Sequence, residues 1–127
     1  MSDKPVAERL QVKKGRRLAV IGAPSEVDRA IGAARAKPGE ADVLLVFARS
    51  RAELNKQLPR LLKAPATAIL WLAYPKLTSK LAGDLSREVV RDTAAAQGLD
   101  TVSQIAIDDD WSAMRLKRVQ KHNIRSS

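Results

Sequence analysis

The stretch that decides the fold is residues 42–48, which read D-V-L-L-V-F-A and are followed at residues 50–53 by S-R-A-E. A continuous apolar run of this length predicts a strand covered on both faces, as in a parallel sheet. The S-x-x-E spacing is that of a capping box, so we expect a helix to begin there and run to about Lys63. Pro59 should kink or split that helix, because it removes one backbone donor.

A similar strand–helix unit precedes this stretch. Residues 17–22 read R-L-A-V-I-G, a short β-leaning run that is closed by a glycine. Ser25 has the chemistry of a helix N-cap, which predicts a helix over residues 26–36. The K-P-G sequence at residues 37–39 should end it.

A third unit follows. Residues 67–74 read T-A-I-L-W-L-A-Y and predict another buried strand, placed at the centre of the sheet. Thr78 and Ser79 are suitable caps for a long helix over residues 80–97. Gly98 is well placed as its C-terminal stop.

The remaining part of the chain predicts a hairpin. Residues 102–107 and 111–119 alternate in polarity, and the three aspartates at 108–110 form the turn between them. The fold class is therefore α/β over residues 1–119: a three-layer mixed sheet of five strands, with three parallel strands joined by crossover helices and a C-terminal antiparallel hairpin. Residues 120–127 are expected to be a basic, mobile tail.

The composition excludes several chemistries. The chain has no cysteine, and its one histidine, His122, lies in the predicted tail. Thiolate chemistry, a Ser–His–Asp triad and transition-metal sites built on His or Cys are thereby excluded. The glycine-rich patterns that cradle dinucleotides and triphosphates are also missing, so we expect no cofactor. The aspartates at 108–110 fit a hard cation or an ordinary turn, and we expect the turn and no metal.

The net charge of +9 is concentrated at the two ends. Residues 1–17 carry six basic and two acidic side chains, residues 115–127 carry five basic and no acidic ones, and the middle is balanced. Such ends fit a solubilising role or the attraction of nucleic acid through a sequence-independent field. The first ten residues contain no apolar signal core, and no apolar run is long enough to span a bilayer, so we expect a cytoplasmic location.

The carboxyl ends of parallel strands are where ligands bind in open α/β sheets. Hydroxyl-capped helix starts and several cations follow the three predicted strands there, which makes an anion site plausible. The simpler interpretation is that these residues are ordinary caps and solvated charges. The candidate ligand-binding residues are Ser25, Arg49, Ser50, Arg51, Lys76, Ser79 and Lys80.

Four segments together resemble an uncharacterised bacterial family of small α/β proteins, known as a domain of unknown function. They are residues 18–24 (L-A-V-I-G-A-P), 42–62 (D-V-L-L-V-F-A-R-S-R-A-E-L-N-K-Q-L-P-R-L-L), 70–76 (L-W-L-A-Y-P-K) and 110–116 (D-W-S-A-M-R-L). The resemblance covers about residues 8–119. It implies no established activity.

More weakly, residues 42–119 resemble the latter part of class I S-adenosylmethionine-dependent methyltransferases in the order of their elements. That resemblance implies a Rossmann-like sheet with the strand order 1-2-3-5-4, in which residues 18–22 act as the first methyltransferase strand and the second and third are missing. The glycine-rich cofactor loop is reduced to Gly22, and the ribose-binding acid has no counterpart. The resemblance therefore implies the methyltransferase shape without methyl transfer.

From these observations we expect a binding or interaction module rather than an enzyme, with an anion site at the strand carboxyl ends. Two alternatives remain open: association with nucleic acid through the basic ends, and a cofactor-binding, methyltransferase-like enzyme. A protein partner and self-association are both compatible with the sequence.

Overall fold

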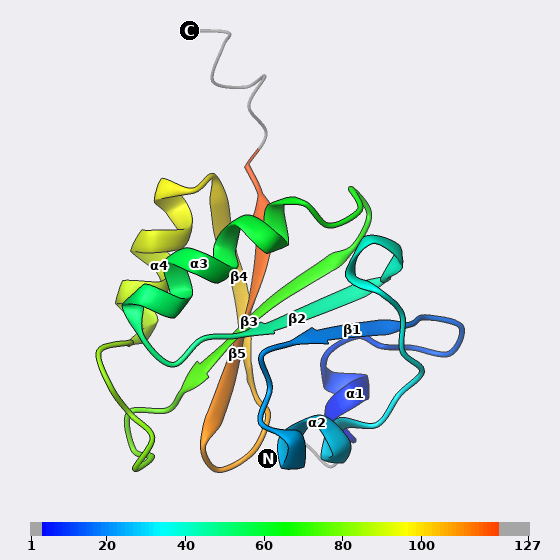
Figure 1. Ribbon diagram of the computed structural model, residues 1–127, viewed down its shortest axis with the longest axis horizontal. Helices are drawn as coiled ribbons and strands as arrows, with labels where there is room; N and C mark the ends of the chain where they lie inside the picture. Colours follow the sequence, from blue (N-terminus) through cyan, green and yellow to red (C-terminus); the bar gives the residue numbers. More distant parts are fainter. Residues whose placement is uncertain (1–3, 120–127) are drawn as a thin grey trace, which may run out of the picture.

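The computed structural model describes residues 4–119 of the chain, and the predicted tail at 120–127 lies outside them. One five-stranded sheet has the order β1-β2-β3-β5-β4 (Figure 1). The first three strands are parallel, and β5 and β4 are antiparallel to their neighbours, which confirms the predicted fold class and strand order. The elements are α1 (Val6–Arg9), β1 (Leu18–Ile21), α2 (Ser25–Ile31), the 3-10 helix η1 (Pro38–Glu40), β2 (Val43–Phe47), α3 (Arg51–Leu62), β3 (Ile69–Pro75), α4 (Arg87–Ala96), β4 (Leu99–Ala106) and β5 (Trp111–Arg118).

The parallel strands form the buried middle of three layers. Every residue of β2 is buried, because α3 and α4 cover one face of the sheet and α1 and α2 cover the other. Strand β2 pairs with β3 in a register that places Leu44 beside Leu70 and Leu45 beside Trp71. Coverage on both faces explains why these strands are continuously apolar rather than alternating.

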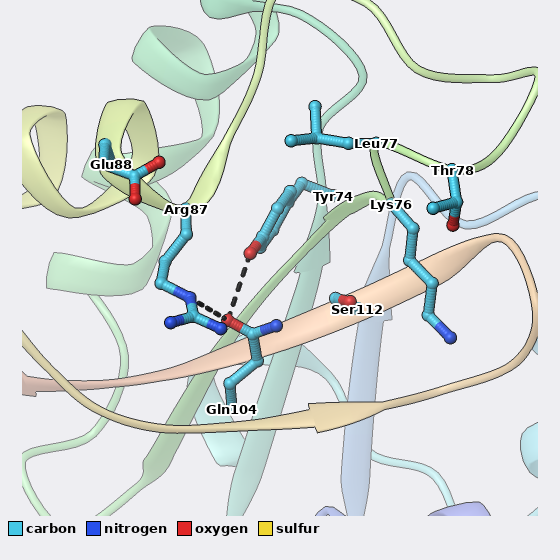
Figure 2. Close-up of a pocket in the computed structure, with 8 residues that line it drawn as sticks. All are labelled: Tyr74, Lys76, Leu77, Thr78, Arg87, Glu88, Gln104 and Ser112. Carbon is cyan, nitrogen blue, oxygen red and sulfur yellow. Dashed lines mark hydrogen bonds between the residues drawn. The ribbon is translucent and has the colours of Figure 1, made fainter.

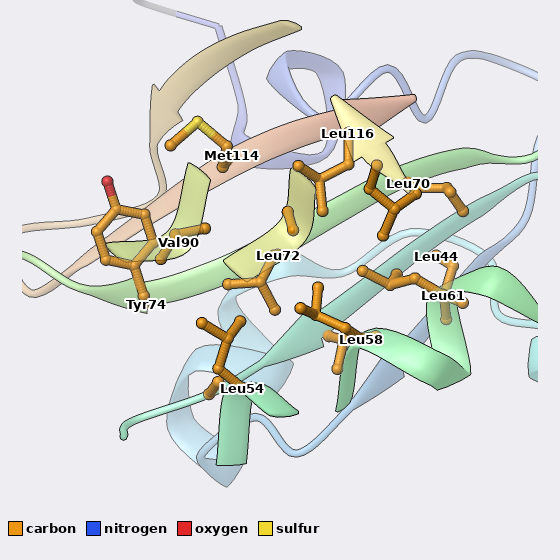
Figure 3. Packing of buried hydrophobic residues seen from close by; sticks show 14 of the residues in the cluster. Leu44, Leu54, Leu58, Leu61, Leu70, Leu72, Tyr74, Val90, Met114 and Leu116 are labelled. Carbon is orange, nitrogen blue, oxygen red and sulfur yellow. The ribbon is translucent and has the colours of Figure 1, made fainter. Parts of the chain in front are cut away.

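On the first face, α3 packs its apolar stripe onto the sheet. Leu54, Leu58 and Leu61 recur at helical spacing, are fully buried, and lie against Leu44 and Leu72 of the sheet (Figure 3). Helix α3 is continuous from Arg51 to Leu62, so the prediction that Pro59 splits it is wrong. The carbonyl that loses its donor belongs to Asn55, an exposed residue where water can take the place of the missing N–H.

On the second face, the N-terminal segment forms a short helix, α1, that the sequence did not predict. Leu10, the residue that ends it, is fully buried, and its carbonyl oxygen accepts a hydrogen bond of 2.9 Å from the indole Nε1 of Trp71. The buried indole thus obtains the partner it needs, and the segment is held against the sheet by that bond as well as by apolar contact.

Helix α2 is shorter than predicted. It ends at Ile31, because Gly32 follows in the left-handed region with a φ of 66°. The chain then runs beside β1, where Arg35 forms a bridge with Leu18. Pro24 precedes the helix and Ser25 is its first residue, with no side-chain cap bond, so the predicted capping role of Ser25 is wrong.

The predicted long helix over residues 80–97 is also corrected. Helix α4 spans only Arg87–Ala96, and Ser86 is its cap, with its hydroxyl accepting from the Val89 N–H at 3.2 Å. Residues 77–81 form turns and residues 82–86 are irregular instead, and Gly83 disfavours helix there. Gly98, with a φ of 84°, ends the helix as predicted.

The C-terminal hairpin is confirmed, but β4 begins earlier than predicted, at Leu99, and its register shifts between Thr101 and Ser103. Asp108 builds the turn by accepting from the N–H groups of Asp110 and Trp111, each at 2.8 Å. Within residues 4–119, no helix has the length and apolar character that crossing a membrane requires.

Candidate functional site

The carboxyl ends of β1, β2 and β3 lie at one edge of the sheet, because the three strands are parallel. Each sequence-predicted ligand residue is on a segment that leaves this edge. Ser25 follows β1, Arg49, Ser50 and Arg51 follow β2, and Lys76, Ser79 and Lys80 follow β3. The structure therefore brings the predicted residues to one edge, but their surroundings differ from strand to strand.

The exit of β1 and β2 is filled by a side chain of the chain itself. Gln57 of α3 reaches back and donates its Nε2–H to the carbonyl oxygen of Phe47 at 3.2 Å. A Cβ added to Gly22, whose φ is 79°, would lie 3.1 Å from that Nε2 atom and 3.3 Å from the same carbonyl oxygen. Gly22 therefore allows Gln57 to approach closely, in the space where the fold would otherwise admit a ligand.

The residues after β2 cap the N-terminus of α3. The Ser50 hydroxyl accepts from the Glu53 N–H at 3.2 Å, and the Glu53 carboxylate accepts from the Arg49 N–H at 2.7 Å. This is the predicted capping box, with the return bond shifted by one residue. The Arg51 N–H donates to the Asp84 carboxylate at 3.0 Å, and the Arg49 guanidinium lies 5.9 Å from the centre of the Trp111 ring.

The exit of β3, in contrast, is hollow. A cavity of about 340 Å³ opens between the end of β3, the start of α4 and the facing surface of the hairpin (Figure 2). Its lining combines two cations, one carboxylate, a phenol, an amide, two aliphatic hydroxyls and an exposed leucine. The lining residues are Tyr74, Lys76, Leu77, Thr78, Arg87, Glu88, Gln104 and Ser112.

One acceptor links two strands and a helix at one wall of this cavity. The Gln104 Oε1 atom accepts from the Tyr74 hydroxyl at 3.1 Å and from the Arg87 Nε at 3.3 Å (Figure 2). Burial raises the pKa of Tyr74 above its ordinary value, and the nearby positive charge of Arg87 only partly opposes that shift. The phenol is therefore protonated at neutral pH and acts as a hydrogen-bond donor.

The two cations of the cavity keep donors available. Arg87 donates its Nε–H to Gln104, and its guanidinium also has a side-chain hydrogen bond with the Tyr74 hydroxyl, which leaves further N–H groups of its five for a ligand. Within residues 4–119 the Lys76 ammonium forms no hydrogen bond or ion pair. In Figure 2 the two side chains lie on opposite sides of Tyr74 and Ser112. With Glu88 as the single acidic lining residue, the cavity carries a net positive charge.

Of the predicted residues that follow β3, only Lys76 lines the cavity. The Ser79 hydroxyl donates to the Asp110 carboxylate at 2.7 Å and accepts from the Leu81 N–H, so it fastens the loop to the hairpin turn. Lys80 is exposed on the same loop. No group of three or more metal-ligating side chains converges in the part of the chain that the structure describes.

Sequence reasoning missed Tyr74, Arg87 and Gln104. Arg87 was hidden because the helix was predicted to start seven residues earlier, although Ser86 is a residue type suited to the N-cap and Glu88 places an acid in the first turn. Gln104 stands at a strand position facing α4, and a polar side chain on a helix-covered strand face was the signal that could have identified it.

Similar folds occur among solved structures. The chain is similar to LepI in complex with SAM (TM-score 0.54, 11% identity), with 89% of this chain aligned to 39% of LepI. It is also similar to a point mutant of MtNAS (TM-score 0.55, 11% identity), with 90% aligned to 57% of that protein. A LepI variant in complex with SAH and a substrate analogue matches over 89% of this chain and 39% of its own, with a TM-score of 0.51.

These neighbours define the class of fold. LepI is in complex with SAM in one structure and with SAH in another, and the low identity of all three neighbours means that the likeness concerns the fold alone. This agrees with the resemblance of residues 42–119 to the methyltransferase order of elements. The chain spans less than two thirds of the length of each neighbour. No family model and no curated relative matches the chain, so the resemblance to a bacterial family stays a prediction.

Proposed function

We propose that this chain is a binding module that takes a small anionic ligand in the cavity at the carboxyl end of β3. The observation that carries the proposal is the pair of cations, Lys76 and Arg87, which line a hollow of about 340 Å³ and keep N–H donors beyond those that Arg87 gives to Gln104 and Tyr74. A carboxylate or phosphate would accept from either side chain, and charge-assisted bonds of this kind are about twice as strong as neutral ones.

The rest of the lining suits recognition better than catalysis. The lining contains no histidine or cysteine, and the Tyr74 phenol, with its raised pKa, is a poor base at neutral pH. The hydroxyls of Thr78 and Ser112 offer further hydrogen bonds to a polar ligand. Leu77, which is 67% exposed at the rim, offers a contact to an apolar part of the same ligand.

The test is a thermal-shift titration with inorganic phosphate and with citrate at low ionic strength. We expect at least one of the two to raise the melting temperature, and Lys76→Gln and Arg87→Gln to reduce that rise strongly. Lys56→Gln removes the same charge from an exposed position on α3 outside the cavity and should respond like the original chain. An equal response of all three variants would overturn the proposal.

A second candidate is a SAM-binding, methyltransferase-like enzyme. The observation that favours it is the likeness of the fold to LepI in complex with SAM. The filled exit of β1 and β2 argues against it, since Gln57 would have to leave the Phe47 carbonyl before a ligand could approach Gly22. Calorimetric titration with SAM separates the candidates: binding that survives Lys76→Gln would favour the enzyme.

A further inference from the structure

A second cavity lies at the opposite end of β3, away from the proposed ligand site. It has a volume of about 340 Å³ and opens where β3 begins and the antiparallel β5 ends. These two strand ends lie side by side in the sheet (Figure 1). Its walls come from the turn that follows α3 and from the two strands. The lining residues are Ala66, Thr67, Ala68, Ile69, Leu70, Arg115, Leu116, Lys117 and Arg118.

The charge of this cavity is wholly positive. Its lining includes Arg115, Lys117 and Arg118 and no acidic residue. The register between β4 and β5 places one acid, Asp100, directly opposite Lys117. Both residues are exposed. Within residues 4–119 these two side chains form no ion pair, so the positive charge is not neutralised inside the protein.

Arg118 forms the fixed part of the wall. Its guanidinium donates to five backbone carbonyls at the end of α3 and in the following turn, the shortest being the bond of 2.6 Å to Ala64. A cation at this position satisfies carbonyls that the helix end leaves free. Arg118 therefore shapes the cavity and keeps few donors for a ligand.

Arg115 and Lys117 are the two lining cations for which no side-chain hydrogen bond or ion pair is formed within residues 4–119. Two residues apart on β5, they point to the same side of the strand. The Nε of Arg115 is buried and has no hydrogen-bond partner. An unpaired buried donor on a charged group is energetically unfavourable. The described part of the chain supplies no acceptor for this guanidinium, so an acceptor on a ligand would stabilise it.

We propose that this second cavity binds a phosphate group, with Arg115 and Lys117 as its donors. Two neighbouring cations without an acid match the double negative charge of a phosphate, and the planar guanidinium can donate to two of its oxygens. Thr67 adds a hydroxyl at the rim.

The phosphate can come from a free polyphosphate or from the backbone of a nucleic acid strand. Inorganic tripolyphosphate and a short single-stranded oligonucleotide are therefore titrated in parallel against the full chain, at several salt concentrations. Lys117→Gln is the principal variant, because the exposed side chain can be changed without disturbing the core. Arg115→Gln is the second variant. Lys37→Gln, an exposed lysine away from both cavities, is the matched control.

We expect Lys117→Gln and Arg115→Gln each to weaken binding of at least one probe by tenfold or more at low salt, and Lys37→Gln to leave it unchanged. If the source is a nucleic acid, the oligonucleotide binds more tightly than tripolyphosphate, and loss of one contact lowers the salt slope by about 0.7. If the source is a free polyphosphate, tripolyphosphate binds at least as tightly. Equal binding by Lys117→Gln and Lys37→Gln, or no binding of either probe, would overturn the proposal.

Discussion

The exits of β2 and β3 differ, although both strands are buried, parallel and adjacent. After β2, the side chains of Gln57 and Trp111 fill the space and Ser50 closes the helix start. After β3, helix α4 begins only at Arg87, twelve residues beyond the strand, and a cavity remains between them. The connection from β2 to α3 is short and its exit is filled, whereas the connection from β3 to α4 is long and its exit is open. In this sheet the length of the connection, more than the kind of residue at its start, decides which exit stays open.

The largest loss of stability is expected from a substitution at the filled exit of β2. Trp111 is buried and packs edge-to-face on Phe47, with 4.9 Å between ring centres. Trp111→Ala should lower the free energy of unfolding by about 3–5 kcal/mol, because it leaves a large cavity. Leu77→Ala at the rim of the open exit should change it by less than about 0.5 kcal/mol. Chemical denaturation measures both, and similar losses would erase the distinction between the two exits.

Gly22 provides the next test of the same closed exit. Gly22→Ala should cost about 1–3 kcal/mol, since the residue has a positive φ and the new methyl group would meet Gln57 and the Phe47 carbonyl. Gly83→Ala on the open side meets only an ordinary contact at 3.4 Å and has no positive φ to strain. A Gly22→Ala protein as stable as the Gly83→Ala protein would show that the approach of Gln57 is loose.

Tyr74 allows a smaller and pH-dependent test of the open exit. Tyr74→Phe should lower the free energy of unfolding by about 0.5–1.5 kcal/mol, the usual worth of one hydrogen bond, here the bond to Gln104. Because burial raises the pKa of Tyr74, the folded state keeps the phenolic proton to a higher pH than the unfolded state does. This stabilisation is complete below about pH 10 and is lost as pH rises through the raised pKa.

The measurement is the difference in unfolding free energy between the original chain and Tyr74→Phe from pH 7 to pH 11. Taking the difference removes the contribution of the lysines, which titrate in the same range. We expect the advantage of the original chain to shrink above about pH 10. A constant difference would contradict the buried, hydrogen-bonded phenol.

The smallest effect on stability belongs to the cations of the open exit. Lys76→Gln should leave the free energy of unfolding within about 0.5 kcal/mol, as for other changes at sites without strong contacts. The binding of an anion should nevertheless fall strongly. A variant that loses stability and binding together would indicate that Lys76 supports the structure instead of the ligand.

Much of the fold could be predicted, because buried parallel strands have a continuous apolar signature and leave little room for other assignments. The runs that became β2 and β3, and the hairpin turn at Asp108, were read correctly for this reason. The start of α4 was predicted wrongly, because Thr78 and Ser79 offer the same capping chemistry as Ser86. The Ser79 hydroxyl donates to the Asp110 carboxylate instead of capping a helix, a distant contact that no local pattern encodes, whereas Gly83 was a local signal against a helix there.

The candidate site was predicted at the level of the sheet edge but not of its side chains. Topology brings Arg49, Arg51 and Lys76 to one edge, and the sequence was sufficient for that. Whether a cation faces a cavity or a packed aromatic ring depends on tertiary packing. The Arg49 guanidinium lies over Trp111, and the Arg51 Nε donates to the Asp84 carbonyl oxygen at 3.5 Å, whereas Lys76 lines the cavity.

The most direct test of an open β3 exit and a closed β2 exit is the mapping of backbone amide shifts by NMR during titration with phosphate, citrate and SAM. We expect an anion to move the amides of residues 76–78, 87–88 and 104 and to leave those of residues 22–25 and 49–51 in place. Shifts concentrated at residues 22–25 and 49–51, above all with SAM, would contradict the account.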